Sequence, residues 1–325
     1  MAQSTSGSGE ARKGYEGTDH KGQDGRDNHY MNGAILITGG AGSVGRSLVA
    51  RCRADGHTVR VFDLPVCDYT GLEGEPGIEV VQGDITQMAT VTPAVQGVSA
   101  VMHLAAILPP ASERNRERTL AINVDGTINI IRAMEASARE AVLVFSSSVS
   151  TYGDTTTETP PVRVEHPQAA LDIYAESKIA SERLVRQAQL PTVVLRIAGI
   201  AVPVLQEPPA VWPFTAEQRL EMVHREDVVT ALYKALITPA AQGKTLNIAG
   251  GPTWQTSGRQ YVADHYEILG VPLEMAAFRG QDEPGWVDWY DSTESQHLLD
   301  YQHHSYTSYL ETLRAEVERM LADDC

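Results

Sequence analysis

The chain has 325 residues, of which 42% are hydrophobic and 21% charged, so it is long enough for a large globular domain with an appended lobe. Its 26 Lys and Arg residues against 42 Asp and Glu give a formal net charge of -16, which argues against nucleic acid or an anionic membrane as a partner. Because it has only three scattered cysteines and no apolar run of membrane-spanning length, we expect a cytoplasmic protein with no disulfide framework and no membrane partner.

Residues 1–30 contain no Val, Ile, Leu, Phe or Trp, so we expect them to form a disordered tail. From Ala34 onward, short apolar runs alternate with helical stretches. The predicted strands are 34–38, 58–63, 78–82, 100–104, 142–146 and 192–197, and the predicted helices between them are 43–54, 113–137 and 169–189. Strands that are apolar on both faces and separated by helices indicate an α/β fold with a Rossmann-type, doubly wound parallel sheet.

After residue 197 this alternation loosens. Residues 202–213 are rich in Pro and predict a loop, whereas 225–237 and 306–321 predict helices and 245–249 predicts a further strand. The segment 291–294 has the sequence of a helix start. We therefore assign residues 31–197 to the main sheet domain and 198–325 to a smaller C-terminal lobe, which is interleaved with the sheet and returns about one strand and one helix to it.

A glycine-rich turn follows the first predicted strand and opens the first predicted helix. It reads Thr38-Gly39-Gly40-Ala41-Gly42-Ser43-Val44-Gly45. Gly39, Gly42 and Gly45 allow a tight turn, a close approach of backbone to a pyrophosphate, and close packing of the helix on the strand. The N-terminus of that helix then presents free N–H groups to the phosphates. The turn therefore predicts that residues 31–197 bind a dinucleotide.

Acidic residues end the next two predicted strands. Asp63 stands where a carboxylate accepts hydrogen bonds from the adenosine ribose hydroxyls and repels a 2′-phosphate, which predicts NAD rather than NADP as the cofactor. Asp84, in the sequence Gly83-Asp84-Ile85, either contacts the adenine edge or serves only as a helix cap.

Tyr174 and Lys178 lie four residues apart at the start of a predicted helix, so their side chains share one face. A nearby ammonium favours the phenolate, which would let Tyr174 accept a proton well below its solution pKa of about 10. Ser148 follows the fifth predicted strand, at the edge of the sheet that faces the cofactor, where a serine can hydrogen-bond a substrate oxygen. We predict that these three residues are catalytic.

Together these residues resemble the extended short-chain dehydrogenase/reductase family, also called the NAD-dependent epimerase/dehydratase family. The resemblance runs from about residue 34 to residue 321 and is strongest up to Arg196. The family motifs stand here, in order, as Thr38–Gly45, Asp63, Gly83–Ile85, His103–Ala106, Asn123–Thr127, Ser147–Gly153, Tyr174 with Lys178, and Leu195-Arg196.

The resemblance implies roles for these positions. Tyr174 becomes the acid/base, Lys178 binds the nicotinamide ribose, and Asn123 steadies the central helix. The cofactor-binding set that it implies is Gly39, Gly42, Ser43, Val44, Gly45, Asp63, Asp84, Ile85, Leu104, Ala105, Ala106, Asn123, Ser146, Tyr174, Lys178 and Ile197. The expected substrate contacts are Ile107, Leu108, Ser148 and Trp212. Similar family members also pair through helices equivalent to 113–137 and 169–189, so we expect a homodimer.

Two departures from the family pattern bear on the substrate. Arg196 is followed by Ile197-Ala198-Gly199, without the Asn that nucleotide-sugar members carry there, and the segment from Arg196 to His224 is short. Residues 202–214 are mostly apolar and Pro-rich, and burying a nucleotide charge among them without a partner would be costly. We therefore expect a small, non-nucleotide alcohol or ketone as the substrate, and poor binding of UDP-sugars.

Three functions are open at this stage. We favour a dehydrogenase or reductase that moves hydride between NAD and a secondary alcohol or ketone. The alternatives are a sugar or nucleotide-sugar epimerase with retained NAD, and a non-catalytic NAD-sensing protein, against which the intact catalytic residues argue.

The ten histidines form no H-x-x-x-H pair and no cluster with cysteine, so we predict no metal site. The four tryptophans of the second half, Trp212, Trp254, Trp286 and Trp289, either fill core or line a substrate pocket.

Overall fold

The computed structural model describes residues 33–323 except 281, 282 and 284, so the predicted tail at 1–30 lies outside the described residues. A parallel sheet of seven strands lies at its centre, in the order β10-β6-β5-β4-β1-β2-β3. The strands are β1 (Ala34–Thr38), β2 (Val59–Asp63), β3 (Ile78–Gln82), β4 (Val98–His103), β5 (Val142–Ser148), β6 (Thr192–Ile197) and β10 (Thr245–Ile248). The strand order reverses between β1 and β4, which is where doubly wound sheets place their ligand crevice.

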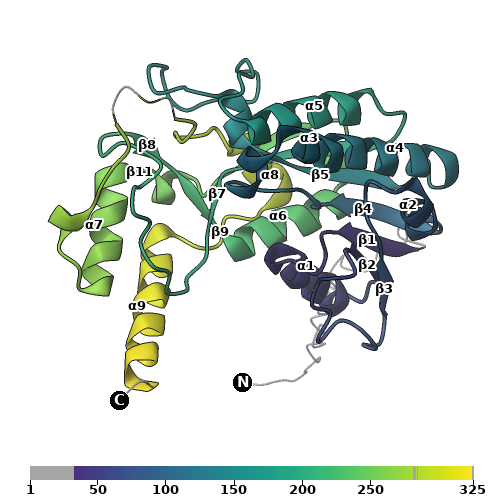
Figure 1. The fold of residues 1–325 in the computed structure, drawn as a ribbon, viewed down its shortest axis with the longest axis horizontal. Helices are drawn as coiled ribbons and strands as arrows, with labels where there is room; N and C mark the ends of the chain where they lie inside the picture. The colour runs from purple at the N-terminus through teal and green to yellow at the C-terminus, as the bar shows by residue number, and fades with distance from the viewer. Residues whose placement is uncertain (1–32, 281–282, 284, 324–325) are drawn as a thin grey trace, which may run out of the picture. The chain divides into compact units, whose positions relative to one another are not determined.

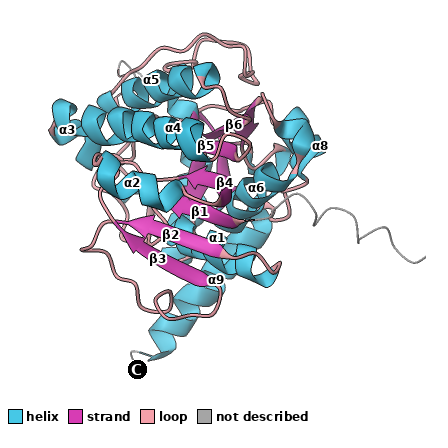
Figure 2. Ribbon diagram, turned by 90° about the vertical axis from the view of Figure 1, so that its right-hand side faces the viewer, coloured by secondary structure: helices cyan, strands magenta, loops and turns pink. Residues whose placement is uncertain are grey.

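Helices cover both faces of this sheet, which confirms the predicted Rossmann-type fold (Figures 1 and 2). The helices α1 (Ser43–Ala54) and α6 (Arg225–Ile237) pack together on one face, while α2 (Met88–Val95), α4 (Gly126–Ser137) and α5 (Ile173–Gln187) cover the other. Within β1, Ile35 and Ile37 join the core on the α1 side, whereas Leu36 joins the core on the α4 side. Burial on both faces explains why these strands are continuous apolar runs in the sequence.

The single helix predicted at 113–137 is wrong. The structure instead has a 3₁₀ turn (Ala111–Arg114), α3 (Arg116–Leu120), a π-helical turn (Ala121–Asp125) and then α4. Asn115 separates the first two because its side-chain oxygen accepts a hydrogen bond from the backbone N–H of Arg118 at 2.9 Å and so caps α3. The helix predicted at 169–189 begins only at Ile173, because the Asp172 carboxylate caps α5 by accepting from the N–H of Ala175 at 2.6 Å.

The second half of the chain adds elements that the sequence pattern does not predict. They are β7 (Gly199–Ala201) paired with β9 (Met222–His224), β8 (Arg219–Leu220) paired with β11 (Thr256–Ser257), and α7 (Gly258–Leu269). The expected helices are present as α8 (Thr293–Leu299) and α9 (Tyr306–Asp323), and β10 and α6 belong to the layers of the main sheet. Across the described residues, no helix combines the length and apolar character needed to cross a membrane.

Candidate active site

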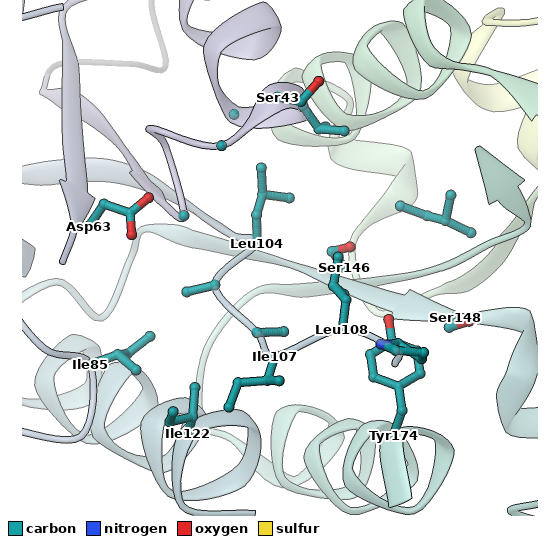
Figure 3. A pocket seen from close by; sticks show the side chains of 18 of the residues that line it. Ser43, Asp63, Ile85, Leu104, Ile107, Leu108, Ile122, Ser146, Ser148 and Tyr174 are labelled. Atoms are coloured by element: carbon teal, nitrogen blue, oxygen red, sulfur yellow. The ribbon is translucent and has the colours of Figure 1, made fainter. Parts of the chain in front are cut away.

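A cavity of about 1180 Å³ lies at the carboxyl ends of the central strands (Figure 3). Most of the residues predicted for the cofactor and substrate line it. These are Gly39, Gly42, Ser43, Val44, Gly45, Asp63, Asp84, Ile85, Leu104, Ala105, Ala106, Ile107, Leu108, Ser146, Ser148, Tyr174 and Ile197. Asn123 and Lys178 are buried and are not part of this lining, and Trp212 lines a different cavity.

The glycine turn has the geometry of a pyrophosphate cradle. Gly39 has a φ of 72°, which favours glycine, and a Cβ on Gly45 would stand 2.4 Å from the carbonyl oxygen of Gly39. Helix α1 therefore packs directly on the turn. Its N-cap residue, Gly42, supplies no side-chain acceptor, and its first turn carries no acidic residue. The first N–H groups of α1 are thus left to an anion at the cavity wall, which is what a dinucleotide pyrophosphate requires.

The other feature expected of a cofactor site is a carboxylate at the end of the second strand, and Asp63 supplies it. Its Oδ2 accepts from the backbone N–H of Ala41 at 3.1 Å, and its Oδ1 accepts from the N–H of Leu64 at 2.9 Å, so the carboxylate is held at the end of β2. Arg46 of α1 is occupied by the carbonyl oxygens of Ala41 and Thr70. A ribose hydroxyl fits beside this carboxylate, whereas a 2′-phosphate would be repelled.

Asp84 does not cap α2, whose N-cap residue is Gln87, and the contact with the adenine edge stays a prediction. Its Oδ1 accepts from the backbone N–H and the hydroxyl of Thr86, at 2.9 and 2.8 Å, and so stabilises the turn that leads into α2. The residue also lines the cavity, next to Ile85, whose side chain points into it (Figure 3).

A buried hydrogen-bond network holds the strand ends beneath the cavity. The Thr127 hydroxyl donates its proton to the carbonyl of Asn123, so Nε2 of His103 must be the donor to Thr127 at 3.0 Å. Nδ1 of the neutral ring then accepts from the Thr38 hydroxyl at 2.8 Å, and that hydroxyl also accepts from the N–H of Ala105 at 3.2 Å. Burial lowers the pKa of His103 to about 3, so the imidazole is neutral, as this network requires.

Asn123 supports the cavity wall from behind. Its Oδ1 accepts from the N–H of Ile107 at 2.7 Å, and its Nδ2 donates to the carbonyl of Ile107 at 3.1 Å and to the Ser177 hydroxyl at 2.9 Å. The π-helical turn places this side chain between the segment that follows β4 and helix α5. The geometry agrees with a steadying role, in which Asn123 acts on the site through Ile107 and α5 rather than by lining the cavity.

Tyr174 and Ser148 lie at the end of the cavity opposite Asp63, and the phenol oxygen points toward the serine (Figure 3). Ser148 ends β5, where its hydroxyl accepts from the backbone N–H of Ser150 at 3.1 Å. Burial and the Asp172 carboxylate hold the pKa of Tyr174 above its usual value, and the Ser148 hydroxyl opposes them. This direction is opposite to the one expected from the Lys178 spacing, because in this structure the desolvation of the phenol outweighs any attraction between phenolate and ammonium.

Lys178 lies beneath the cavity. Its Nζ donates to the carbonyl oxygen of Ser146 at 2.7 Å and lies 5.6 Å from the centre of the Tyr174 ring. Burial lowers the pKa of Lys178 to about 8, although the carboxylate of Glu182 opposes this effect. The ammonium is therefore held close to Tyr174 but directed at the strand end.

Glu113, which the sequence does not single out, holds the helix that carries Tyr174. Its carboxylate oxygens accept from the backbone N–H groups of Ile173 and Tyr174, at 2.9 and 3.1 Å. Together with Asp172 it satisfies the free N–H groups of the first turn of α5. The 3₁₀ turn that bears Glu113 follows Leu108 and Pro109 of the cavity wall, so one segment both lines the cavity and fixes the position of Tyr174.

The wall around Tyr174 is mainly apolar. Ile107 and Leu108 line the cavity, and so do Ile200 and Trp286 from the second half of the chain, while Ile122 lines it nearer to Ile85 (Figure 3). Of the four tryptophans of the second half, Trp286 lines this cavity, whereas Trp254 is buried in the core. Among the described residues of this lining, Arg118 alone is basic.

The structure also gathers a His/Asp cluster that no spacing in the sequence indicates. His224, Asp227 and His304 offer ligand atoms within 4.8 Å of one another. However, the two imidazole rings stack at a centroid distance of 4.1 Å and an angle of 17°, and lone pairs in nearly parallel planes do not meet at one ion. Nδ1 of His304 is also 2.6 Å from the Asp227 carboxylate, which it binds directly. This arrangement suits a structural clamp between α6 and the segment before α9.

The family profile described as NAD dependent epimerase/dehydratase matches residues 35–204, which include the glycine turn, Asp63 and the Tyr174–Lys178 pair. The chain belongs to this family. The family is NAD-dependent, and NAD is the cofactor that the cradle and the carboxylate of this chain fit. The cofactor and the resemblance inferred from the sequence are thereby confirmed.

Relatives within the family act on different substrates. The 3 beta-hydroxysteroid dehydrogenase/Delta 5-->4-isomerase of Mycobacterium tuberculosis is 33% identical over 158 residues, which are 47% of this chain and 42% of the relative. The UDP-glucose 4-epimerase of Lactobacillus helveticus is 33% identical over 159 residues, which are 47% of this chain and 46% of the relative. The matched region thus spans less than half the length of these relatives.

A solved structure covers more of the chain. The short-chain dehydrogenase/reductase superfamily protein from Agrobacterium tumefaciens, crystallised with NAD, is 25% identical with a TM-score of 0.74, covering 90% of this chain and 99% of that one. Family and relatives are NAD-dependent enzymes, both dehydrogenases and epimerases, and the match extends the shared fold into the second half of the chain.

Proposed function

We propose that this protein is an NAD-dependent dehydrogenase or reductase that interconverts a secondary alcohol and a ketone on a largely apolar, non-nucleotide substrate. The observation that carries the proposal is the placement of Ser148 and Tyr174 at one end of a cavity whose other end holds the NAD cradle. Bound NAD supplies the hydride acceptor or donor. The residues of the chain then have to bind the substrate oxygen, move one proton and keep water away.

Each catalytic side chain has a part that follows from its position. The Ser148 hydroxyl donates a hydrogen bond to the substrate oxygen and fixes its place beside the phenol. Tyr174 takes the proton from the alcohol during oxidation and returns it during reduction. The buried Lys178 lies close enough to favour the phenolate once the reaction has begun, and its attachment to the carbonyl of Ser146 keeps it in that place.

The wall around Tyr174 supports an apolar substrate. Leu108, Ile200 and Trp286 offer it no charge, and Arg118 is the basic residue of the described lining. NAD brings its own pyrophosphate, so a nucleotide sugar would bury a second diphosphate with too few cations to pair with it. The similarity to a hydroxysteroid dehydrogenase supports a cyclic alcohol of this kind.

The test is formation of NADH by the purified protein. We expect it with 3β-hydroxysteroids and simpler cyclic secondary alcohols, and no C4 epimer from UDP-glucose in a product assay. The alternative, an epimerase with retained NAD, is favoured by the similarity to the Lactobacillus helveticus enzyme. Conversion of UDP-glucose to its epimer without net NADH would replace our proposal with that one.

We also propose that the protein is a homodimer that pairs through α4 and α5, by analogy with other family members. Light scattering at micromolar concentration tests this proposal, and the mass of a single chain would refute it.

A further inference from the structure

Glu182 is a buried carboxylate that takes no part in the proposed proton transfer. It lies on α5, four residues after Lys178, and its side chain is fully buried. An ionised group is costly to bury unless it is paired, so its partners show what it holds in place. Its two oxygens accept hydrogen bonds from side chains of β5, of β6 and of the loop before α5, as well as from α5 itself.

Arg196 of β6 forms a bidentate pair with this carboxylate. Its Nε donates to Oε1 at 3.0 Å and its Nη2 donates to Oε2 at 2.8 Å. The guanidinium is itself fixed, because Nη1 donates to the carbonyl of Val164 at 2.9 Å and its central carbon lies 4.8 Å from the centre of the Tyr152 ring. Burial alone would raise the pKa of Glu182, but the hydrogen bonds and charge of Arg196 hold it below its ordinary value. The carboxylate is therefore ionised and held in one place.

Ser147 connects the carboxylate to the end of β5. Its hydroxyl donates to Oε1 of Glu182. The residues on either side of it carry groups of the active site, since the carbonyl of Ser146 accepts from Lys178 at 2.7 Å and the hydroxyl of Ser148 lies beside the catalytic phenol (Figure 3). Neighbouring side chains of a strand point to opposite faces, so Ser147 can bind α5 without entering the site. One hydroxyl thus ties the catalytic end of β5 to the helix that carries the tyrosine and the lysine.

We infer that Glu182 is a positioning residue for the proposed hydride transfer, because it holds the end of β5 against α5 through Ser147 and so keeps Ser148 beside Tyr174. Arg196 in turn keeps the carboxylate in place. The inference rests on the proposed function, since it assumes that the reacting oxygen lies at Ser148 and Tyr174. A carboxylate that only stabilised the fold would contribute equally through each of its partners, whereas a positioning carboxylate acts on kcat through Ser147 alone.

Two substitutions separate these roles, because each removes one neutral donor from the same carboxylate. Ser147→Ala removes the bond to the end of β5, and Gln168→Ala removes the bond of 2.9 Å from the loop before α5. We expect Ser147→Ala to lower kcat for a cyclic secondary alcohol by about tenfold, with KM and the dissociation constant of NAD unchanged. Gln168→Ala should leave all three quantities unchanged.

A double variant tests the carboxylate itself. Glu182→Leu together with Arg196→Met removes the buried pair without leaving one charge alone. If it folds, it should lower kcat at least as much as Ser147→Ala, and an unchanged kcat overturns the inference. If it does not fold, the two single variants decide.

The outcomes separate this inference from the proposed function. If NADH forms from the alcohol but both single substitutions lower kcat equally, or neither does, the inference is overturned and the proposed function stands. If the unaltered protein forms no NADH from any alcohol, the proposed function fails, and hydrogen exchange of the ligand-free variants decides the inference. Faster exchange of residues 146–150 in Ser147→Ala than in Gln168→Ala supports it, and equal exchange in the two variants overturns it.

Discussion

The two ends of the main cavity are built in different ways. At the cofactor end, the glycine turn and Asp63 come from the continuous unit β1-α1-β2, and most of what they offer is backbone geometry. At the substrate end, Leu108, Tyr174, Ile200 and Trp286 come from four segments spread over the chain. The cofactor end can therefore stay constant across a family while the substrate end changes with each segment. This difference explains how relatives with similar identity to this chain can be named for steroids and for sugars.

The largest expected effect is at the substrate end. Tyr174→Phe keeps the ring in place and removes only the proton carrier, so kcat should fall by at least about 100-fold while NAD binds as before. Steady-state kinetics and a calorimetric titration with NAD measure the two quantities. Tyr233→Phe is the control, because Tyr233 lies on α6 and contacts His57 at a distance of 3.1 Å. A Tyr174→Phe enzyme with more than half the activity would show that the assignment is wrong.

The second largest expected effect is on the pH dependence of folding stability, and it comes from Lys178. Burial lowers its pKa to about 8 in the folded protein, against an ordinary value of 10.5. Between these values the unfolded chain holds the proton and the folded one does not, so the folded state gains stability as pH rises through this window. Over the whole window, the free energy of unfolding should rise by an amount on the order of 3 kcal/mol. Denaturant unfolding of the ligand-free protein at pH 7 and pH 10 measures it, with Lys178→Met as the reference. A difference between the two proteins that does not change with pH would contradict this prediction.

The sequence predicts the cofactor end well for a physical reason. A parallel strand, a tight turn and a helix follow each other in the chain, so the spacing of Gly39, Gly42 and Gly45 directly encodes their geometry. The substrate end lacks such a code. Glu113 reaches the backbone of Tyr174 across 61 positions, and Trp212 lines a second cavity, where a bridge to Phe278 holds its backbone. These contacts depend on how segments pack together, which local patterns do not specify.

The sequence pattern also predicted the wrong direction for the pKa of Tyr174 and a single continuous helix at 113–137. The four-residue spacing to Lys178 indicated the shared helix face but not the burial that dominates the pKa of Tyr174. Likewise, the apolar periodicity of 113–137 conceals the Asn115 cap and the π-helical turn at Asn123. In both cases a tertiary interaction outweighs the local pattern.

At the cofactor end, Gly45→Ala tests the packing of α1 on the turn. The added Cβ would lie 2.4 Å from a backbone oxygen that cannot move without opening the glycine turn. We expect a loss of about 1–3 kcal/mol of stability and weaker NAD binding. Gly56→Ala is a useful comparison, because its Cβ would meet nothing within 4 Å, although its positive φ of 85° carries some strain. If NAD binds equally well to both variants, the turn does not cradle the pyrophosphate.

Cofactor choice is a smaller effect at the same end. We expect NAD to bind at least tenfold more tightly than NADP, or about 1.4 kcal/mol, because the Asp63 carboxylate accepts from ribose and repels phosphate. Asp63→Ala should reduce this ratio, whereas Glu79→Gln, on the exposed side of β3, should leave it unchanged. Titration of both cofactors against tryptophan fluorescence measures the ratio. A preference for NADP in the unaltered protein would be evidence against this role of Asp63.

The smallest predicted effect tests whether the substrate end is held together by contacts distant in the chain. Glu113→Gln keeps the size of the side chain but replaces one of the two oxygens that accept from the N–H groups of Ile173 and Tyr174. An amide N–H₂ group directed at a backbone N–H cannot pair with it, so the first turn of α5 should loosen and Tyr174 should spend less time beside Ser148. We expect kcat to fall by about threefold to tenfold while the affinity for NAD is unchanged. Arg116→Gln is the matched control, because it removes an exposed ion pair with Glu176 on the same turn of α5. A positioning role for Glu113 predicts that this control changes kcat far less. If both variants lower kcat equally, or if Glu113→Gln weakens NAD binding instead, the carboxylate only stabilises the helix and does not position the tyrosine.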